Sequence, residues 1–561
     1  MRIASLTAAG RRRAGLCVDA ALRAATSAGA MRLRPMSALW ARLLAAAALP
    51  EPVRGRMARR VAQARLRDGD ALAAEATLRA AADRSADPRR RADLLLESLG
   101  AAAPVDGLRQ GLPPVLREAV EADLAAADTA HLRGEPALAA RAIDRAMAIQ
   151  FHRELHFDRL GSPLAADPDG FLAPLRDSTA VRALAARGRA RPAARASTDR
   201  PLRLLVATRT NASFLREIRD RYARHSGVEM RFLDLGADPR REPLTRHVED
   251  MTRALLGDRS TPFADEVERW LRPHLDWSDT VLIDWCVSTA VLFTMVDPGD
   301  ARIVVRLHSF ELFTAWPHLV SFGRVDDMVV VSDHLRAFTH AVLPRARPRV
   351  HVIPNAVELH RFRRPKAADA RFTLGLIGVG AVAKDPRWAI AVLRLLRRAD
   401  ARYRLLLVGA LSDGPTASAR CYQRLLASDL AELEPSGAVR AVGPTGDVPA
   451  ALSAIGTILS SSVRESFHVA LVEGAASGAV PVVRDWPFFV GRARGARSVF
   501  PDDWVVSTPE AAAERILALT ADEGRWRTAG EEAAAYALAT WDWSVVSRRW
   551  DDLLLSADSH P

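Results

Sequence analysis

Two glutamates in the last third of the chain lie at a spacing that suits a ligand site. Glu465 follows a run of serines after an apolar segment, and Glu473 comes eight residues later, before Gly478 and a Pro-Val-Val run. This pattern predicts a strand, a loop with Glu465, a helix from about Phe467 and a second strand. Amide groups at the start of such a helix can bind a phosphate, while carboxylates accept hydrogen bonds from sugar hydroxyls. We therefore predict a nucleotide-sugar site; two solvent-facing or helix-capping glutamates are the alternative.

A lysine that follows two glycines is the second candidate. Of the 79 basic residues only Lys366 and Lys384 are lysines, and Lys384 follows Gly378 and Gly380 at a predicted strand-to-helix turn. An ammonium group at such a turn can stabilise a leaving diphosphate as negative charge develops on it. A solvated surface lysine is the alternative, and the rarity of lysine in this chain favours the functional interpretation.

The same turn also matches a dinucleotide-binding pattern, Gly378-x-Gly380-x-x-Ala383. That pattern requires an acidic residue about 20 residues later, at the end of the next strand, to hold a ribose. Here the next strand ends at Val408 and is followed by Gly409. A nucleotide-cofactor oxidoreductase is therefore ranked well below sugar transfer.

Two other patterns are better explained by local structure. His152-x-Glu154-x-His156 places two imidazoles on one helix face without a third ligand, so packing or capping is favoured over zinc. Asp167-Pro-Asp169 is typical of a turn. The sequence has no phosphate-binding P-loop motif and no nucleophile-elbow motif, which argues against NTPases and serine hydrolases.

The composition indicates a folded chain of several domains. Of 561 residues, 49% are hydrophobic and 26% charged, which suits roughly three or four domains. The net charge of +12 favours anionic partners, but the arginines are dispersed and only 6% of residues are aromatic, so a nucleic-acid surface has no support. No apolar run reaches the ~18 residues of a membrane span, and the three cysteines form no disulfide pattern. We expect a cytoplasmic protein, with peripheral contact to the inner face of the cytoplasmic membrane as an option.

The character of the sequence changes near residue 200. Residues 50–185 are rich in Ala, Leu and Arg at helical spacing, and the similar segments 69–74 and 134–140 weakly indicate tetratricopeptide-type hairpins. Residues 186–200 are polar and basic, which predicts an exposed linker. Beyond it, short apolar segments alternate with helical ones, as in parallel sheets covered on both faces. The predicted strands lie near residues 202–207, 230–235, 280–284, 303–307, 328–331, 372–377, 403–408, 439–442, 457–460 and 480–483.

We therefore expect an α/β protein with two doubly wound, Rossmann-like domains that face a cleft, preceded by an all-helical region. The predicted parts are a basic N-terminal arm (1–49), a helical, tetratricopeptide-like region (50–185), a linker (186–200), a first sheet domain for the acceptor (201–355), a second for the nucleotide sugar (356–525), and a C-terminal helix that crosses back to the first domain (526–561).

These features resemble the GT-B glycosyltransferases of family 4, whose signature is a Glu, seven residues, Glu segment followed by a small-residue turn and Pro-Val-Val. Segments 306–311 with His308, 326–332 and 352–362 are similar to other elements of that family. The similarity extends over about residues 200–555 and does not include the first 190. One departure is Val379, at a position where the related transferases have an arginine that shares the diphosphate with the lysine; Arg387 and Arg464 are the candidate substitutes.

The resemblance implies a retaining, metal-independent transferase without a cofactor, which moves a hexose-type sugar from a nucleotide diphosphate sugar to a hydroxyl of a glycan or lipid-linked acceptor. It implies that Glu465 contacts the donor sugar, that Glu473 binds the ribose, and that His308 lies beside the reacting sugar. The catalytic candidates are His308, Lys384 and Glu465. The donor-binding candidates are Gly378, Gly380, Lys384, Glu465, Ser466, Phe467, His468, Val469 and Glu473, and the acceptor-side candidates are Thr208, Asn211 and Glu311.

A second hypothesis treats the chain as an interaction protein. In that case the helical first third docks a protein partner and the transferase body is degenerate, as the loss of the arginine at Val379 hints. Binding of nucleoside diphosphates discriminates the two hypotheses, because a degenerate body binds none of them.

Overall fold

A computed structural model describes residues 44, 50–68, 70–102, 111–380, 382–411, 414, 416–489 and 495–555. The predicted N-terminal arm, apart from Leu44, lies outside the described residues. The described chain divides into two compact units. The smaller unit contains the first helices together with residues 113–119 and 413–423, and the larger one contains both sheets.

The first helices of the chain pack through alanine. They are α4 (Glu51–Arg67), α5 (Ala71–Ala82) and α6 (Pro88–Ala102). Asp70 begins α5 by accepting a hydrogen bond from the Ala73 amide, as an N-cap does. Ala58 of α4 and Ala74 of α5 are fully buried, and such small side chains allow helix backbones to approach closely. The prediction of helical structure here is confirmed.

Further helices follow before the first sheet, and the chain enters the larger unit within α7. The helices are α7 (Pro114–Leu132), α8 (Pro136–Gln150), α9 (Arg153–His156), α10 (Pro163–Ala166), α11 (Pro168–Asp177) and α12 (Thr179–Leu184). Asp128 of α7 binds the start of α12, because its Oδ1 accepts hydrogen bonds from Ser178 Oγ at 2.6 Å and from the Ala180 amide at 2.8 Å. These helices are therefore held to one another by polar contacts as well as by packing.

The first sheet has six parallel strands in the order β2-β1-β3-β4-β5-β6. Four of its strands are buried along nearly their whole length, so both faces are covered. The strands are β1 (Leu202–Thr208), β2 (Val228–Asp234), β3 (Thr280–Asp284), β4 (Arg302–Leu307), β5 (Asp327–Val330) and β6 (Arg349–Val352). The helices are α13 (Arg216–Arg224), α14 (Glu242–Arg246), α15 (Val248–Leu255), α16 (Phe263–Trp277), α17 (Ser288–Met295), α18 (Ser309–Leu312) and α19 (Asp333–Val342).

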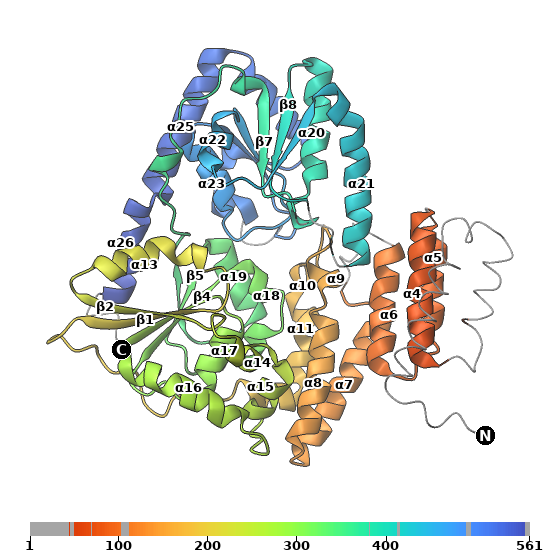
Figure 1. The fold of residues 1–561 in the computed structure, drawn as a ribbon, viewed down its shortest axis with the longest axis vertical. Coiled ribbons are helices and arrows are strands. Elements are labelled where there is room, and N and C mark those ends of the chain that lie inside the picture. The colour runs from red at the N-terminus through yellow and green to blue at the C-terminus, as the bar shows by residue number, and fades with distance from the viewer. Residues whose placement is uncertain are drawn as a thin grey trace. The chain divides into compact units, whose positions relative to one another are not determined.

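The second sheet is also six-stranded and parallel, in the order β12-β11-β10-β7-β8-β9. Figure 1 shows both sheets with their surrounding helices. The strands are β7 (Thr373–Ile377), β8 (Arg404–Val408), β9 (Val439–Gly443), β10 (Thr457–Ser460), β11 (Val480–Arg484) and β12 (Val505–Val506). The helices are α20 (Pro386–Ala399), α21 (Ala417–Leu433), α22 (Val448–Ser453), α23 (Val469–Ala476), α24 (Pro509–Thr520) and α25 (Glu523–Trp541).

The predicted fold class is confirmed: two Rossmann-like α/β domains follow a helical region. Each of the ten predicted strands is present. Within the described residues, two strands were not predicted, β6 and β12, and both lie at sheet edges.

The last helix, α26 (Trp543–Leu555), packs on the first sheet domain. Trp550 and Leu554 are fully buried in the core formed with β1 and β3, and Arg302 donates a hydrogen bond to the Leu553 carbonyl at 2.8 Å. Figure 1 shows α26 beside α13, and Arg221 of α13 forms an ion pair with Asp551. The chain therefore passes from the second domain back to the first.

Residues 186–200 are mostly exposed, but their arginines bind the first sheet domain. Arg189 lies 2.5 Å from Asp326 and Arg200 lies 2.6 Å from Asp279. Because guanidinium groups pair with carboxylates at the start of strands here, this segment is attached along its length. Among the described residues, no helix combines the length and apolar character needed to cross a bilayer.

Candidate functional site

Four loops at the carboxyl ends of strands carry unusual backbone geometry. Asn211, Trp285, Asp385 and His468 have φ of 52°, 69°, 40° and 66°, and no other non-glycine residue in the described chain has a positive φ. They follow β1, β3, β7 and β10, two in each domain. A positive φ costs free energy in residues with a side chain, and such residues cluster at functional sites. The strained positions therefore mark the sheet edges at which the sequence predicts ligand binding.

Lys384 and Glu465 meet in the second domain. Lys384 ends the 3-10 turn η6 (Val382–Lys384), and its Nζ lies 2.5 Å from Glu465 Oε1. Ser462 Oγ donates a second hydrogen bond to the same oxygen at 2.7 Å, and His468 Nε2 lies 3.8 Å from it. Within the described chain, Glu465 Oε2 accepts no hydrogen bond, and Lys384 Nζ makes this contact alone. One carboxylate oxygen and two ammonium protons thus remain for a ligand.

The electrostatics of this pair favour full ionisation of the carboxyl group. Burial by itself would raise the pKa of Glu465, but the Lys384 ammonium, His468 and the hydrogen bonds lower this pKa to about 2. Burial lowers the pKa of His468 to about 4. At neutral pH the site therefore holds an ionised Glu465 and a neutral His468.

The two loops that carry this pair are bound to each other. The Val463 amide donates to the Ala383 carbonyl at 2.8 Å, and Ser461 Oγ donates to the Lys384 carbonyl at 2.5 Å. Asp385, at the start of α20, pairs with Arg484 of β11 at 2.6 Å. The position of Lys384 is thus fixed by backbone contacts, which is the arrangement that a preorganised charge requires.

The start of α23 presents backbone donors. Within the described residues, the amides of Ser466, Phe467, His468 and Val469 donate no hydrogen bond to another protein atom. These residues lead into α23, an eight-residue helix whose dipole adds partial positive charge at this end. The amides lie directly after Glu465 in the chain, so unpaired donors follow the ion pair. This combination suits the phosphate group of an anionic ligand.

Gly474 allows α23 to pack close to strand β10. A Cβ added to Gly474 would lie 2.5 Å from Ile458 Cγ1 in β10, so only glycine allows the helix to pack this near the strand. Glu473, the residue before it, is half-buried. Burial raises the pKa of Glu473 to about 7, and the charge of Glu217 in α13 adds to this effect, while Arg361 and Arg216 act against it. Glu473 therefore lies among charged groups of both domains and titrates near neutral pH.

In the first domain, His308 is buried against an aromatic ring. It stacks on Trp285 with ring centroids 4.2 Å apart, and Phe214 lies 6.0 Å away. Both ring nitrogens of His308 are buried and without a hydrogen-bond partner among the described residues. An imidazole with two unpartnered nitrogens is costly unless a ligand or water supplies the partner. His308 thus has the capacity to bind a ligand group.

Glu311 binds the backbone of the loop that carries His308. Its Oε1 accepts hydrogen bonds from the His308 amide at 3.1 Å and from the Cys286 amide at 3.2 Å, whereas Oε2 is buried and unpartnered in the described chain. The carboxylate therefore holds together the loops after β3 and β4. Glu311 therefore has a positioning role, and its carboxylate is not exposed to an acceptor.

The remaining site residues predicted from the sequence differ in their burial and in their hydrogen bonds. Thr208 is buried, and its hydroxyl donates to the Thr210 carbonyl at 2.8 Å, so it shapes the loop after β1. Asn211 is exposed and its side chain makes no hydrogen bond within the described chain. Gly378 has a φ of 85° and lies next to Lys384, because a Cβ at Gly378 would be 3.8 Å from Lys384 Cε. Gly380 is half-buried at the same turn.

The arginines proposed to replace Val379 are engaged elsewhere. Val379 is buried. Arg387 pairs with Asp429 at 2.6 Å. The Arg464 guanidinium lies 4.8 Å from the Phe157 ring and 5.0 Å from the Phe313 ring, a cation-π arrangement. Lys384 is therefore the cation that the loop geometry places beside Glu465.

Several residues that were not predicted as part of the site join the two sheet domains here. The Ser309 amide donates to Ser466 Oγ at 2.9 Å, and Ser332 Oγ donates to the Ser466 carbonyl at 2.8 Å. His334 Nε2 lies 3.0 Å from the Glu465 carbonyl oxygen. These contacts hold the loop with Glu465 against the first domain. Single serines carry no spacing signal, so the sequence alone did not reveal them.

The two patterns expected to be local are local. His152 accepts a hydrogen bond from the Glu154 amide at the start of α9, and His156 is buried between Ser162 Oγ and the Gln150 carbonyl, each at 2.8 Å. Asp167 caps α11 by accepting from the Gly170 amide at 3.0 Å. No cluster of three or more metal-ligating side chains occurs in the part of the chain that is described.

Comparison with known proteins gives a likeness in structure only. No protein-family model matches the chain, and no curated protein matches it significantly. Among solved structures, Anabaena HepE in complex with UDP and glucose is 14% identical with a TM-score of 0.47, over 63% of this chain and 100% of that one. A Rickettsia africae glycosyltransferase is 14% identical with a TM-score of 0.46, over 64% of this chain and 100% of that one.

A third match is sucrose-phosphate synthase from Thermosynechococcus elongatus, at 16% identity and a TM-score of 0.45, over 63% of this chain and 98% of that one. The order of parallel strands in two Rossmann-like sheets, with α26 returning to the first, is a GT-B-like architecture. The matches have TM-scores below 0.5 and identities of 14% to 16%, so they carry no statement about activity, and the description of the fold rests on the sheets themselves.

Proposed function

We propose that the chain is a glycosyltransferase that takes a sugar from a nucleotide diphosphate donor. The observation that carries this proposal is the juxtaposition in the second domain of a cation, an ionised carboxylate and unpaired amides. Lys384 pairs with Glu465, and the amides of Ser466 to Val469 follow directly at the start of α23. A diphosphate needs the cation and the donors, and a sugar needs the carboxylate.

Donor binding would use groups that the protein itself leaves unsatisfied. The diphosphate oxygens would accept hydrogen bonds from the α23 amides and from Lys384 Nζ, which has two protons without a partner. Glu465 Oε2 would accept from a sugar hydroxyl, since Oε1 is already engaged by Lys384 and Ser462. Glu473 would accept from the ribose, in the role that the family resemblance implies.

Catalysis would rest on fixed charge. As the bond between sugar and diphosphate breaks, negative charge grows on the diphosphate, and Lys384 and the amides stabilise it without reorganising solvent. No metal is invoked in this scheme, in line with the resemblance. On the opposite side His308, with its two unpartnered nitrogens, would face the reacting sugar or the acceptor hydroxyl. Retention of anomeric configuration and a glycan or lipid-linked acceptor belong to the same proposal.

A donor-hydrolysis screen tests the proposal. The purified protein is incubated with a panel of common nucleotide sugars, UDP-glucose included, and released nucleoside diphosphate is measured. We expect slow release from at least one donor, which is lost in the Lys384→Ala variant. Release from no donor, with or without a panel of simple glycosides as acceptors, would count against the assignment.

The alternative of an interaction protein has one observation in its favour. Val379 is buried and Arg387 is paired with Asp429, so neither position supplies the expected second cation in the described part of the chain. In that case the second domain does not bind nucleotide, and the helical region is the functional part. Calorimetric titration with nucleoside diphosphates distinguishes the two, since only the transferase binds them.

A further inference from the structure

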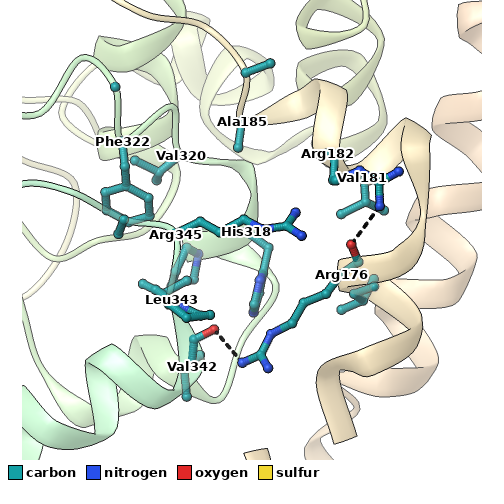
Figure 2. Close-up of a pocket in the computed structure, with 16 residues that line it drawn as sticks. Arg176, Val181, Arg182, Ala185, His318, Val320, Phe322, Val342, Leu343 and Arg345 are labelled. Atoms are coloured by element: carbon teal, nitrogen blue, oxygen red, sulfur yellow. Dashed lines mark hydrogen bonds between the residues drawn. The ribbon is translucent and has the colours of Figure 1, made fainter. Parts of the chain in front are cut away.

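A cavity of about 300 Å³ lies between helices α11 and α12 and the first sheet domain. One wall is formed by α11, α12 and residues 185–186, and the other by residues 317–323 and by the end of α19 with residues 343–346. Figure 2 shows this cavity with its lining side chains. None of the lining residues belongs to the candidate transferase site.

The lining is apolar with a basic edge. Most of the wall is made of aliphatic and aromatic side chains, which are Leu175, Val181, Val320, Phe322, Val342 and Leu343. Three arginines, Arg176, Arg182 and Arg345, also line the cavity, and among the described residues no aspartate or glutamate does. Figure 2 shows Arg176 and Arg182 on the helices and Arg345 on the first domain. The electrostatic preference of such a cavity is for an anion.

Two nitrogens on this lining lack partners. Arg176 Nε and His318 Nε2 are buried, and neither makes a hydrogen bond in the described chain. Burial lowers the pKa of His318 to about 4, so its ring is neutral at pH 7 and can donate or accept one hydrogen bond at each nitrogen. A buried donor without an acceptor is unfavourable in an empty cavity. These atoms therefore point to a ligand that carries polar atoms.

The three arginines differ in whether their positive charge is already paired with an acidic residue. Arg176 is paired with Asp169 at 2.7 Å and donates to the Ala341 carbonyl at 2.6 Å. Among the described residues, Arg182 donates only to neutral carbonyl oxygens, those of Arg176 and Asp177. Arg345 is exposed and has no hydrogen bond or ion pair within the described residues. Arg182 and Arg345, from opposite walls, thus keep uncompensated charge at the edge of an apolar cavity.

We propose that this cavity binds a small anionic amphiphile, a single apolar chain that ends in a carboxylate or phosphate group. The apolar chain would replace water against the aliphatic wall, and the oxyanion would lie between the guanidinium groups of Arg182 and Arg345. The volume of the cavity limits the size of the ligand. At about 30 Å³ for each group of the size of a water molecule, the cavity holds roughly ten non-hydrogen atoms. This ligand site is independent of the proposed transferase activity.

Calorimetric titration of the full-length protein tests the proposal. The probes are octanoate, octyl phosphate and 1-octanol, each below its micelle concentration, so the two anions separate a carboxylate head from a phosphate head. We expect saturable, one-site binding of at least one anion and binding of 1-octanol that is at least about tenfold weaker, because a charge-assisted hydrogen bond is lost.

Three variants locate the binding. Arg345→Gln removes the exposed charge and should weaken anion binding about tenfold without changing 1-octanol binding. Ala185→Trp, at an exposed lining position, should fill the cavity and abolish binding of every probe. Arg398→Gln is the matched control, since Arg398 is likewise an exposed and unpaired arginine but lies on α20, and it should leave all affinities unchanged.

The proposal would be overturned by any of three results. These are no saturable binding of either anion, equal affinity for 1-octanol and the anions, and anion binding that survives both Arg345→Gln and Ala185→Trp. Thermal unfolding of each variant checks that the fold is kept, and all three substituted positions are exposed. Donor hydrolysis is measured in parallel, so failure of the ligand site and failure of the transferase proposal are seen separately.

Discussion

Lys384 Nζ lies 2.5 Å from Glu465 Oε1, although 81 residues separate the two in the chain. The contact joins the loop after β7 to the loop after β10, and the Val463 amide and Ser461 hydroxyl bind the first of these loops as well. A mobile surface lysine would not be fixed in this way. The pair thus converts two sequence candidates into one preorganised charge site.

Replacement of Lys384 by alanine should abolish most transfer. If the ammonium stabilises the leaving diphosphate, its loss should lower turnover by about 10²- to 10³-fold, as the loss of one preorganised donor does elsewhere. The same change also leaves the half-buried Glu465 without its cation and should destabilise the fold by about 1–3 kcal/mol.

The double variant Lys384→Ala, Glu465→Gln separates these two effects. It removes the unpaired charge and should recover the thermal stability of the parent protein, while activity stays low. Recovery of activity together with stability would show that Lys384 acts only as a structural partner.

Glu473 should give the activity a pH dependence near neutrality. Its pKa is raised to about 7, so the carboxylate that would bind a ribose hydroxyl becomes fully available only above that pH. We expect kcat/KM of the parent protein to rise through an apparent pKa near 7 and the rise to be absent in Glu473→Gln. A profile that is identical in both proteins would exclude a role for this carboxylate.

Glu473 should make stability fall as the pH rises, whereas it makes activity rise. Because the folded protein holds this proton more tightly than the unfolded chain, whose Glu pKa is near 4.5, the free energy of unfolding should fall as pH rises from about 4.5 to about 7. The effect is of the order of 1–3 kcal/mol. Urea unfolding of the parent and of Glu473→Gln at pH 5 and pH 8 checks it, with the variant gaining relative stability at pH 8.

His308 should matter for turnover and not for nucleotide binding. It lies in the first domain, stacked on Trp285, whereas the proposed diphosphate site lies in the second. His308→Ala should therefore lower kcat by about 10- to 10³-fold with an unchanged Kd for nucleoside diphosphate. A large loss of nucleotide affinity in this variant would contradict the assignment of roles to the two domains.

Gly474→Ala should destabilise the second domain. The added methyl group would lie 2.5 Å from Ile458 Cγ1, and overpacking of this kind costs about 1–3 kcal/mol, more than the helix propensity that alanine gains. Gly55→Ala is the matched control, since this helical glycine in α4 has nothing within 4 Å of the added Cβ. Chemical denaturation should show a loss in the first variant and none in the second.

Much of the fold could be predicted because buried parallel strands are continuous apolar runs. The segments at β1, β3, β8 and β10 carry this signal, and each appears where the sequence places it. The strand β6 was not predicted, since its Arg349-Val-His-Val352 pattern is half-exposed at a sheet edge and precedes a proline. The strand β12 has only two residues, too few for any periodicity.

Part of the candidate site could be proposed from the sequence, for a physical reason. Helix starts, glycine turns and acidic pairs have local sequence patterns, so Lys384, Glu465 and the α23 amides could be named as candidates. The contacts of Trp285 with His308, and of Ser309 with Ser466, depend on the packing of segments far apart in the chain. No local pattern encodes such pairs. The strained φ of Trp285 is likewise visible only in three dimensions.

Calorimetric titration of nucleoside diphosphates into the purified protein and into Lys384→Ala tests the central claim most directly. If Lys384 belongs to a nucleotide site, we expect one-site binding of at least one diphosphate by the parent protein, weakened about tenfold or more by the substitution and unchanged by the control Arg398→Gln. Absence of binding across UDP, GDP, ADP, CDP and dTDP, or equal binding by parent and Lys384→Ala, would contradict it.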